Sequence, residues 1–210
     1  MISKEEIEQR RTSEELISFV QEVRERVNSD ANELRKARSR EGLYKEFVDE
    51  VIPLSQFAYL LYAEDTLFLP VLGNQGYDVE VFDNDNNLID KIEIAKPHDG
   101  RGMAEDNRLV NNRGFGQINI LDFGGQLDPL KPWIAKSAEK KSLKDYSDCT
   151  LVFVAAMDPP FDEELPTLKK RVEEMVEELT QMEYLAKRAF FAVPALNACF
   201  PIKLKANNAN

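Results

Sequence analysis

A chain of 210 residues, 43% of them hydrophobic, can bury one substantial core, and this length favours one domain over two. Asp and Glu number 38 against 27 Lys and Arg, and the net charge of −11 excludes general attraction to phosphate backbones or acidic membranes, so any nucleic-acid contact must be local. One histidine and two cysteines exclude multi-histidine metal sites and disulfide scaffolds, but an oxygen-ligand metal site stays open.

The first half of the chain predicts helices followed by a β-hairpin. Ser3 with Glu6 is the pattern of a capping box, so residues 1–30 are expected to form an N-terminal helical arm. A second helix begins near residue 30, and Pro53 ends or kinks it. Beyond it, two runs rich in β-branched and aromatic residues, 77–83 and 88–96, flank an Asx-rich turn and predict a hairpin.

The second half alternates between helical and strand patterns. Helices are expected over 103–112, 128–146 and 163–187, and strands over 116–121, 150–157 and 189–193. The run 150–157 is apolar throughout, which predicts a central strand covered on both faces. The expected fold class is therefore α/β: a mixed central sheet flanked by helices in a single domain over 31–202, with a flexible tail over 203–210.

The hairpin brings carboxylates together. A turn centred on residues 85 and 86 places Asp78 opposite Glu93, and Glu80 opposite Lys91, on one face of the sheet. The other face is expected to be apolar, with Tyr77, Val79, Val81, Ile92 and Ile94. Two carboxylates about 5 Å apart at Cβ repel each other unless a cation lies between them. Mg²⁺ or Mn²⁺ accepts such ligands and can activate a water molecule for attack on a phosphodiester.

These residues carry a resemblance to a known family. Gly76–Tyr77–Asp78 and Glu93–Ile94–Ala95–Lys96, with a helix before them and a helix and a strand after them, resemble the PD-(D/E)XK nuclease superfamily over residues 43–157. The resemblance implies a restriction-endonuclease-like fold, an endonuclease or exonuclease activity, and Asp78 and Glu93 as ligands of Mg²⁺. It also implies that the carbonyl of Ile94 and an acidic residue of the preceding helix, Glu50 or Glu46, complete the site.

The source of the family's lysine stays open. That lysine normally stands two residues after the glutamate, where this chain has Ala95. Lys96 follows directly but points to the opposite face of a regular strand. Lys91 lies on the correct face, although pairing with Glu80 is its more ordinary role. The resemblance also allows Lys141 or Lys144, because relatives of this fold sometimes supply the lysine from the helix after the hairpin.

Basic residues concentrate in the middle of the chain. The candidates for nucleic-acid binding are His98, Arg101, Arg108 and Lys140. A histidine in a polar surface turn, such as His98, more often has no role in binding. Exposed lysines on a helix are as often solvated as they are part of a binding surface. Asp78 and Glu93 could likewise only line a wet face of the sheet.

Two functions therefore remain. The first is a nuclease acting on DNA or RNA, with a site built on Asp78 and Glu93. The alternative is a catalytically inactive member of the same fold that binds a protein partner through its acidic surface; Ala95 and the net charge favour it. No membrane association is expected, a homodimer stays open, and the absence of a signal peptide favours the cytoplasm.

Overall fold

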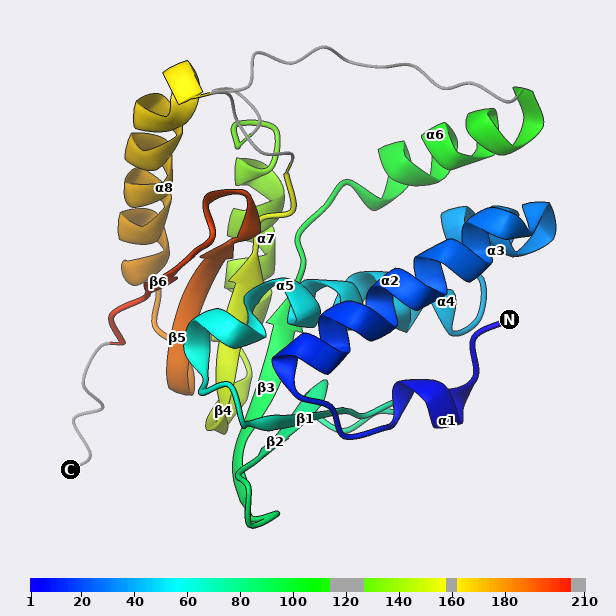
Figure 1. Ribbon diagram of the computed structural model, residues 1–210. Helices are drawn as coiled ribbons and strands as arrows, with labels where there is room; N and C mark the ends of the chain where they lie inside the picture. The colour runs from blue at the N-terminus through cyan, green and yellow to red at the C-terminus, as the bar shows by residue number, and fades with distance from the viewer. Residues whose placement is uncertain (114–126, 158–161, 205–210) are drawn as a thin grey trace.

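A mixed sheet forms the centre of the computed structural model, which describes residues 1–113, 127–157 and 162–204 (Figure 1). In chain order, the strands of these ranges are β1 (Leu67–Pro70), β2 (Val79–Phe82), β3 (Leu88–Ala95), β4 (Asp145–Val154), β5 (Leu185–Val193) and β6 (Ala198–Pro201). The spatial order is the same, with antiparallel pairing from β1 to β3, parallel pairing from β3 to β5, and β6 antiparallel to β5. The expected α/β class is confirmed, whereas the expected strand at 116–121 lies outside the described residues.

The predicted hairpin is present, with the expected register along most of its length. Val79 pairs with Ile92 and Glu80 with Lys91, and the register shifts only beyond Val81, near the turn. The turn suits its sequence, because Asn86 adopts a positive φ of 62°, a conformation that asparagine tolerates well.

One expectation for the hairpin was wrong. Tyr77 does not join the apolar face: its hydroxyl donates a hydrogen bond of 2.9 Å to Glu80, and the ammonium of Lys91 lies 4.8 Å from its ring centroid. Residue 77 precedes β2, so strand alternation does not fix the direction of its side chain.

The apolar run near residue 150 is the central strand that its composition predicted. β4 lies between β3 and β5, parallel to both, and is buried from Cys149 to Val154. Two neighbouring helices are shorter than expected: α7 spans Lys131–Ser142, and α8 spans Leu165–Thr180. Periodicity overextends both helices because residues 145–146 and 185–186 already pair in the sheet.

Helices cover both faces of the sheet (Figure 1). On one face, α7 and α8 pack Ile134 and Leu168 against Leu151 and Phe153. On the other face the buried residues come from α2 (Ser13–Ser29), α5 (Ile52–Leu61) and the strands, and they include Leu16, Leu54, Phe57, Val79, Ile92 and Val152. Each such aliphatic or aromatic side chain contributes roughly 1.5–3 kcal/mol through its removal from water.

The N-terminal arm consists of two helices that pack on the domain. The predicted capping box of Ser3 and Glu6 opens α1 (Lys4–Ile7), and a second box of Thr12 and Glu15 opens α2. Between them, Arg11 exchanges backbone hydrogen bonds of 3.0 and 2.8 Å with Phe68 in β1. No helix within the described ranges is long and apolar enough to cross a bilayer.

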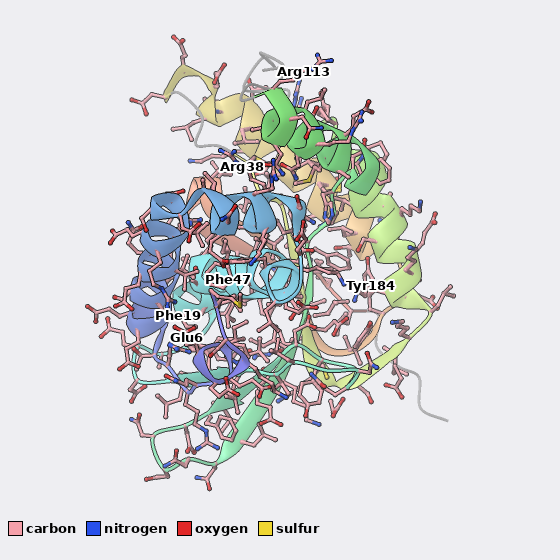
Figure 2. All side chains as sticks on the ribbon, turned by 90° about the vertical axis from the view of Figure 1, so that its right-hand side faces the viewer. Glu6, Phe19, Arg38, Phe47, Arg113 and Tyr184 are labelled. Carbon is pink, nitrogen blue, oxygen red and sulfur yellow. The ribbon has the colours of Figure 1, made fainter. Side chains whose placement is uncertain are left out.

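A π-helical turn positions acidic residues beside the sheet. The helix that begins with α4 (Tyr44–Glu46) continues through the π-turn η1 (Phe47–Val51) into α5, and the Ile52 N–H donates to the Phe47 carbonyl, five residues back. Pro53 follows at once and has no N–H to continue the ladder. The ring of Phe47 packs edge-on against Phe19, at a centroid distance of 5.9 Å, which fixes the turn against α2 (Figure 2). Pro53 therefore coincides with an irregular turn inside the helix and does not end it.

Candidate functional site

Asp78 lies at the open end of the hairpin, opposite the turn and just before β2. Its backbone N–H donates to the Ile92 carbonyl at 2.8 Å, and its Oδ2 accepts a 2.7 Å hydrogen bond from the Ile94 N–H. The β-ladder itself ends at Val79 and Ile92, so Asp78 is not a ladder partner of Glu93, and its carboxylate lies instead over the backbone of β3. Burial and the negative charge of Glu93 raise the pKa of Asp78 to about 7. The two carboxyl groups thus interact, as expected.

Glu93 meets a lysine from α7. Lys141 Nζ forms an ion pair with Glu93 Oε1, and the side chains are only 16% and 12% exposed, so the pair is largely shielded from water. The hydroxyl of Tyr146 at the start of β4 donates to the same oxygen at 3.3 Å. Burial alone would lower the pKa of Lys141, but the attraction of Glu93 outweighs it and keeps the group an ammonium.

Helix phase explains why Lys141 reaches the sheet. It follows the buried residues Ile134 and Ala138 of α7 at spacings of seven and three, which places it on the same helical face. Lys144 lies beyond the end of α7 and is exposed. Tyr146 was not foreseen; the only signal in the sequence was a polar aromatic residue just before an apolar strand.

Glu50 on the π-turn adds a third carboxyl group. Burial raises its pKa to about 8, and the negative charges of Asp78, Glu46, Asp49 and Glu93 add to the shift. Glu46 Oε2 is buried without a hydrogen-bond partner among the described residues. Carboxyl groups from the helix and from the hairpin are thus within electrostatic reach of one another.

The other candidate lysines bind elsewhere. Lys96 donates to the carbonyl of Val48 in the π-turn at 2.9 Å, on the face of β3 opposite Glu93. Lys91 binds Asp148 at 2.8 Å and does not bind its cross-strand neighbour Glu80. The expected Lys91–Glu80 contact was therefore wrong, because Asp148 competes for the ammonium from β4. Ala95, at the family's lysine position, is buried in the cluster under α7 and α8.

Most of the candidate nucleic-acid contacts lie apart from the carboxylates. Arg40 Nη1 lies 2.8 Å from His98 Nε2, and Lys96 O lies 2.9 Å from Nδ1. Because Arg40 can only donate, this arrangement assigns the proton to Nδ1, and both nitrogens are in use. Lys140 is exposed on α7. Arg108 is exposed on α6 (Gly100–Arg113), and the side chain of Arg101 lies outside the described part of the chain.

No family model, curated protein or solved structure matches the chain. Any function proposed for the protein therefore rests on the geometry of the site. Asp78 before β2, Glu93 on β3 and Lys141 on α7 converge at one place in the fold, with Glu50 nearby.

The donor chemistry fits a hard divalent cation in part. Asp78, Glu93 and Glu50 offer carboxylate oxygens, which Mg²⁺ prefers, and it commonly needs only one or two of them with waters. The partnerless oxygen of Glu46 and the mutual repulsion of these groups indicate a deficit of positive charge. Across the described ranges, however, no three His, Cys, Asp or Glu side chains are arranged to hold a metal, and Lys141 binds one Glu93 oxygen. The residues thus fit a water-rich site with two protein carboxylates.

The raised pKa of Glu50 makes stability depend on pH. In metal-free buffer, the folded state keeps a proton on Glu50 between its ordinary value of 4.5 and about 8, whereas the unfolded chain has released it. The wild type therefore loses stability as the pH rises through this window. Glu50→Gln should be more stable than wild type above pH 8, by about 2 kcal/mol because solvent screens the partly exposed Glu50, and similar to it below pH 4.5, measured by urea unfolding.

Glu139→Gln is the matched control, because Glu139 is exposed on α7. It should leave the pH profile unchanged. A stability gain from Glu50→Gln that is the same at every pH would show that Glu50 ionises normally.

Proposed function

We propose that the protein is a Mg²⁺- or Mn²⁺-dependent nuclease with a PD-(D/E)XK-like site that hydrolyses phosphodiester bonds of DNA or RNA. The observation that carries the proposal is the convergence of Asp78, Glu93 and Lys141 from three separate elements. A structural ion pair explains Glu93 and Lys141 alone. It does not explain why a second, half-buried carboxyl group, Asp78, lies beside them.

The order of elements supports the finer fold assignment. A helix precedes an antiparallel run of three strands, and α7 then leads into β4, which is parallel to β3. This is the order that the resemblance implies for a restriction-endonuclease-like core. Asp78 lies just before β2, Glu93 lies on the adjacent β3, and Lys141 reaches Glu93 from the crossover helix α7.

Each residue has a role that follows from its place. Asp78 and Glu93 would hold the metal, with the carbonyl of Ile94 and the carboxylate of Glu50 as further oxygen donors. When bound, the metal would supply an activated water molecule and positive charge for the phosphate. Lys141 would add a fixed positive charge beside the reacting phosphate, where negative charge grows as the water attacks phosphorus and the bond to the leaving oxygen breaks. Tyr146 would keep Glu93 oriented by its hydrogen bond.

Metal binding is the first test. Titration calorimetry and thermal melts with Mg²⁺ and Mn²⁺ should detect binding to the wild type, and saturation to ten times Kd stabilises the folded state by about 1.4 kcal/mol. For a chain of this size, that corresponds to a rise in Tm of about 3–6 °C. Asp78→Ala should lose the shift and the cleavage of labelled DNA and RNA, whereas Asp83→Ala, in the hairpin turn, should keep both.

The absence of any metal-dependent shift at millimolar metal would overturn the proposal. Metal binding without cleavage would favour the alternative, an inactive member of the fold that acts through a protein partner. One observation favours that alternative: the Lys141 ammonium already neutralises Glu93 without any metal.

A further inference from the structure

A basic groove separates α3 (Ala31–Ser39) from α6. Its volume is about 350 Å³, and polar side chains of both helices line it: Arg35, Arg38, Arg40, Asn107, Arg108 and Asn111. Figure 2 shows Arg38 at the boundary between the two helices. The groove lies outside the carboxylate cluster of the candidate site.

The groove carries positive charge in a protein of net charge −11. No Asp or Glu of the described ranges lines it. Arg35, Arg38 and Arg108 are exposed, and none of them forms a salt bridge within the described part of the chain. Exposed like charges around one hollow repel each other, and an anion placed between them would relieve that repulsion.

Contacts between the helices hold the groove open in a defined shape. The Asn111 side-chain amide donates to the Ser39 hydroxyl at 3.0 Å and to the Arg35 carbonyl at 3.4 Å. Arg40 Nη2 contacts the sulfur of Met103 at 3.5 Å. Guanidinium and amide groups along such walls are the donors that bind phosphate oxygens in nucleic-acid complexes.

A salt bridge joins the groove to the π-turn that carries Glu50. Arg40, in the groove wall, forms a salt bridge of 3.0 Å with Asp49 of the π-turn. The next residue in the chain is Glu50, the carboxyl group that the π-turn contributes to the candidate site. The groove wall and Glu50 are thus connected through a single residue, Asp49.

We infer that the α3/α6 groove binds the phosphate backbone of the nucleic acid whose phosphodiester is cleaved at Asp78 and Glu93. The choice of a nucleic acid over a small phosphate rests on the proposed function. Arg35, Arg38 and Arg108 contact successive phosphates, and Arg40 fixes the groove to the π-turn. Binding there is independent of sequence, because phosphate contacts position a strand and do not read its bases.

The test is fluorescence anisotropy with labelled single- and double-stranded oligonucleotides in EDTA, where binding is measured without cleavage. Arg38→Ala/Arg108→Ala should weaken binding at least about tenfold. The plot of log K against log salt should become less steep, with a slope smaller in magnitude by about 1.4 for single strands or 1.8 for double strands. Lys169→Ala/Lys170→Ala, on exposed residues of α8, removes the same charge and should change affinity less than about twofold. Arg38→Lys/Arg108→Lys should recover most of the slope. Melting curves confirm that each variant folds.

Equal losses of affinity in the α3/α6 and α8 variants would contradict binding in the groove, since the change in net charge alone would then explain them. Absence of oligonucleotide binding by the wild type at low salt would also overturn it. Displacement by pyrophosphate as effectively as by unlabelled oligonucleotide would assign a small phosphorylated ligand instead. Asp78→Ala should bind like the wild type in EDTA. A wild type that binds oligonucleotides through the groove but shows no metal-dependent cleavage would count against the nuclease alone.

Discussion

Replacement of Lys141 by alanine should lower metal-dependent cleavage by about 100- to 1000-fold, the usual cost of removing one group that stabilises developing charge in the transition state. Lys141 is largely buried and touches the Glu93 carboxylate, so no solvent cation replaces it readily. The measurement is single-turnover cleavage at saturating metal, where the charge of Glu93 stays compensated. Lys140→Ala is the matched control, because Lys140 is the adjacent residue and is exposed.

A rescue variant makes the assignment sharper. Ala95→Lys on the Lys141→Ala background would place an ammonium at the position that the family normally uses, two residues after Glu93. Ala95 is only 4% exposed and packs among the residues under α7 and α8, so a lysine there overpacks the core at a cost of about 1–3 kcal/mol. Partial recovery of cleavage is therefore expected. Unchanged cleavage in Lys141→Ala, with a loss in Lys144→Ala, would move the role to Lys144.

Local patterns in the sequence were sufficient to predict the hairpin and its carboxylates. Strand alternation and an Asx-rich turn fix which residues pair, and the register of Val79 and Glu80 follows directly. Asp78 was expected to face Glu93 through this register, but it lies beyond the ladder, where a side-chain bond to the Ile94 amide holds it. Its neighbourhood was predictable, whereas its hydrogen bond depends on a local departure from strand geometry.

The choice of lysine needed tertiary structure. Sequence left Lys141 and Lys144 equivalent, because the end of α7 could not be located to within a few residues. The phase of the helix against the sheet distinguishes them, since Lys141 continues the buried stripe of Ile134 and Ala138. The position of Lys96 was the simpler case: alternation along β3 predicted that it would face away from Glu93, and it does.

Features that join distant segments gave no signal in the sequence. The α3/α6 groove combines Arg35 and Arg38 with Arg108, about seventy residues apart, and only the packing of the two helices brings them together. The π-turn that presents Glu50 is equally hidden, because Pro53 predicts an irregularity but not its form.

The ion pair between Glu93 and Lys141 should also be a determinant of stability. Glu93→Ala in metal-free buffer is expected to destabilise the fold by about 2–4 kcal/mol, because it leaves the largely buried ammonium of Lys141 without a partner. Lys141→Met, which leaves Glu93 beside Asp78 without a cation, should cost a similar amount. Urea unfolding of both variants at neutral pH measures the two losses.

The double variant Glu93→Ala/Lys141→Met measures the interaction of the two groups separately from their interactions with the surroundings. Removing both charges should cost less than the sum of the single losses, with a coupling free energy of about 1–3 kcal/mol, because neither partner is left as a buried, uncompensated ion. Lys91→Met, which breaks the more exposed contact with Asp148, should cost less than about 1 kcal/mol and serves as the matched control. Additive losses in the cycle would show that the two groups do not interact in solution, and Lys141 would then lose its assigned place beside Glu93. A coupling that disappears when Mg²⁺ is added would show instead that the cation competes with the ammonium for Glu93, as a metal site on that carboxylate requires.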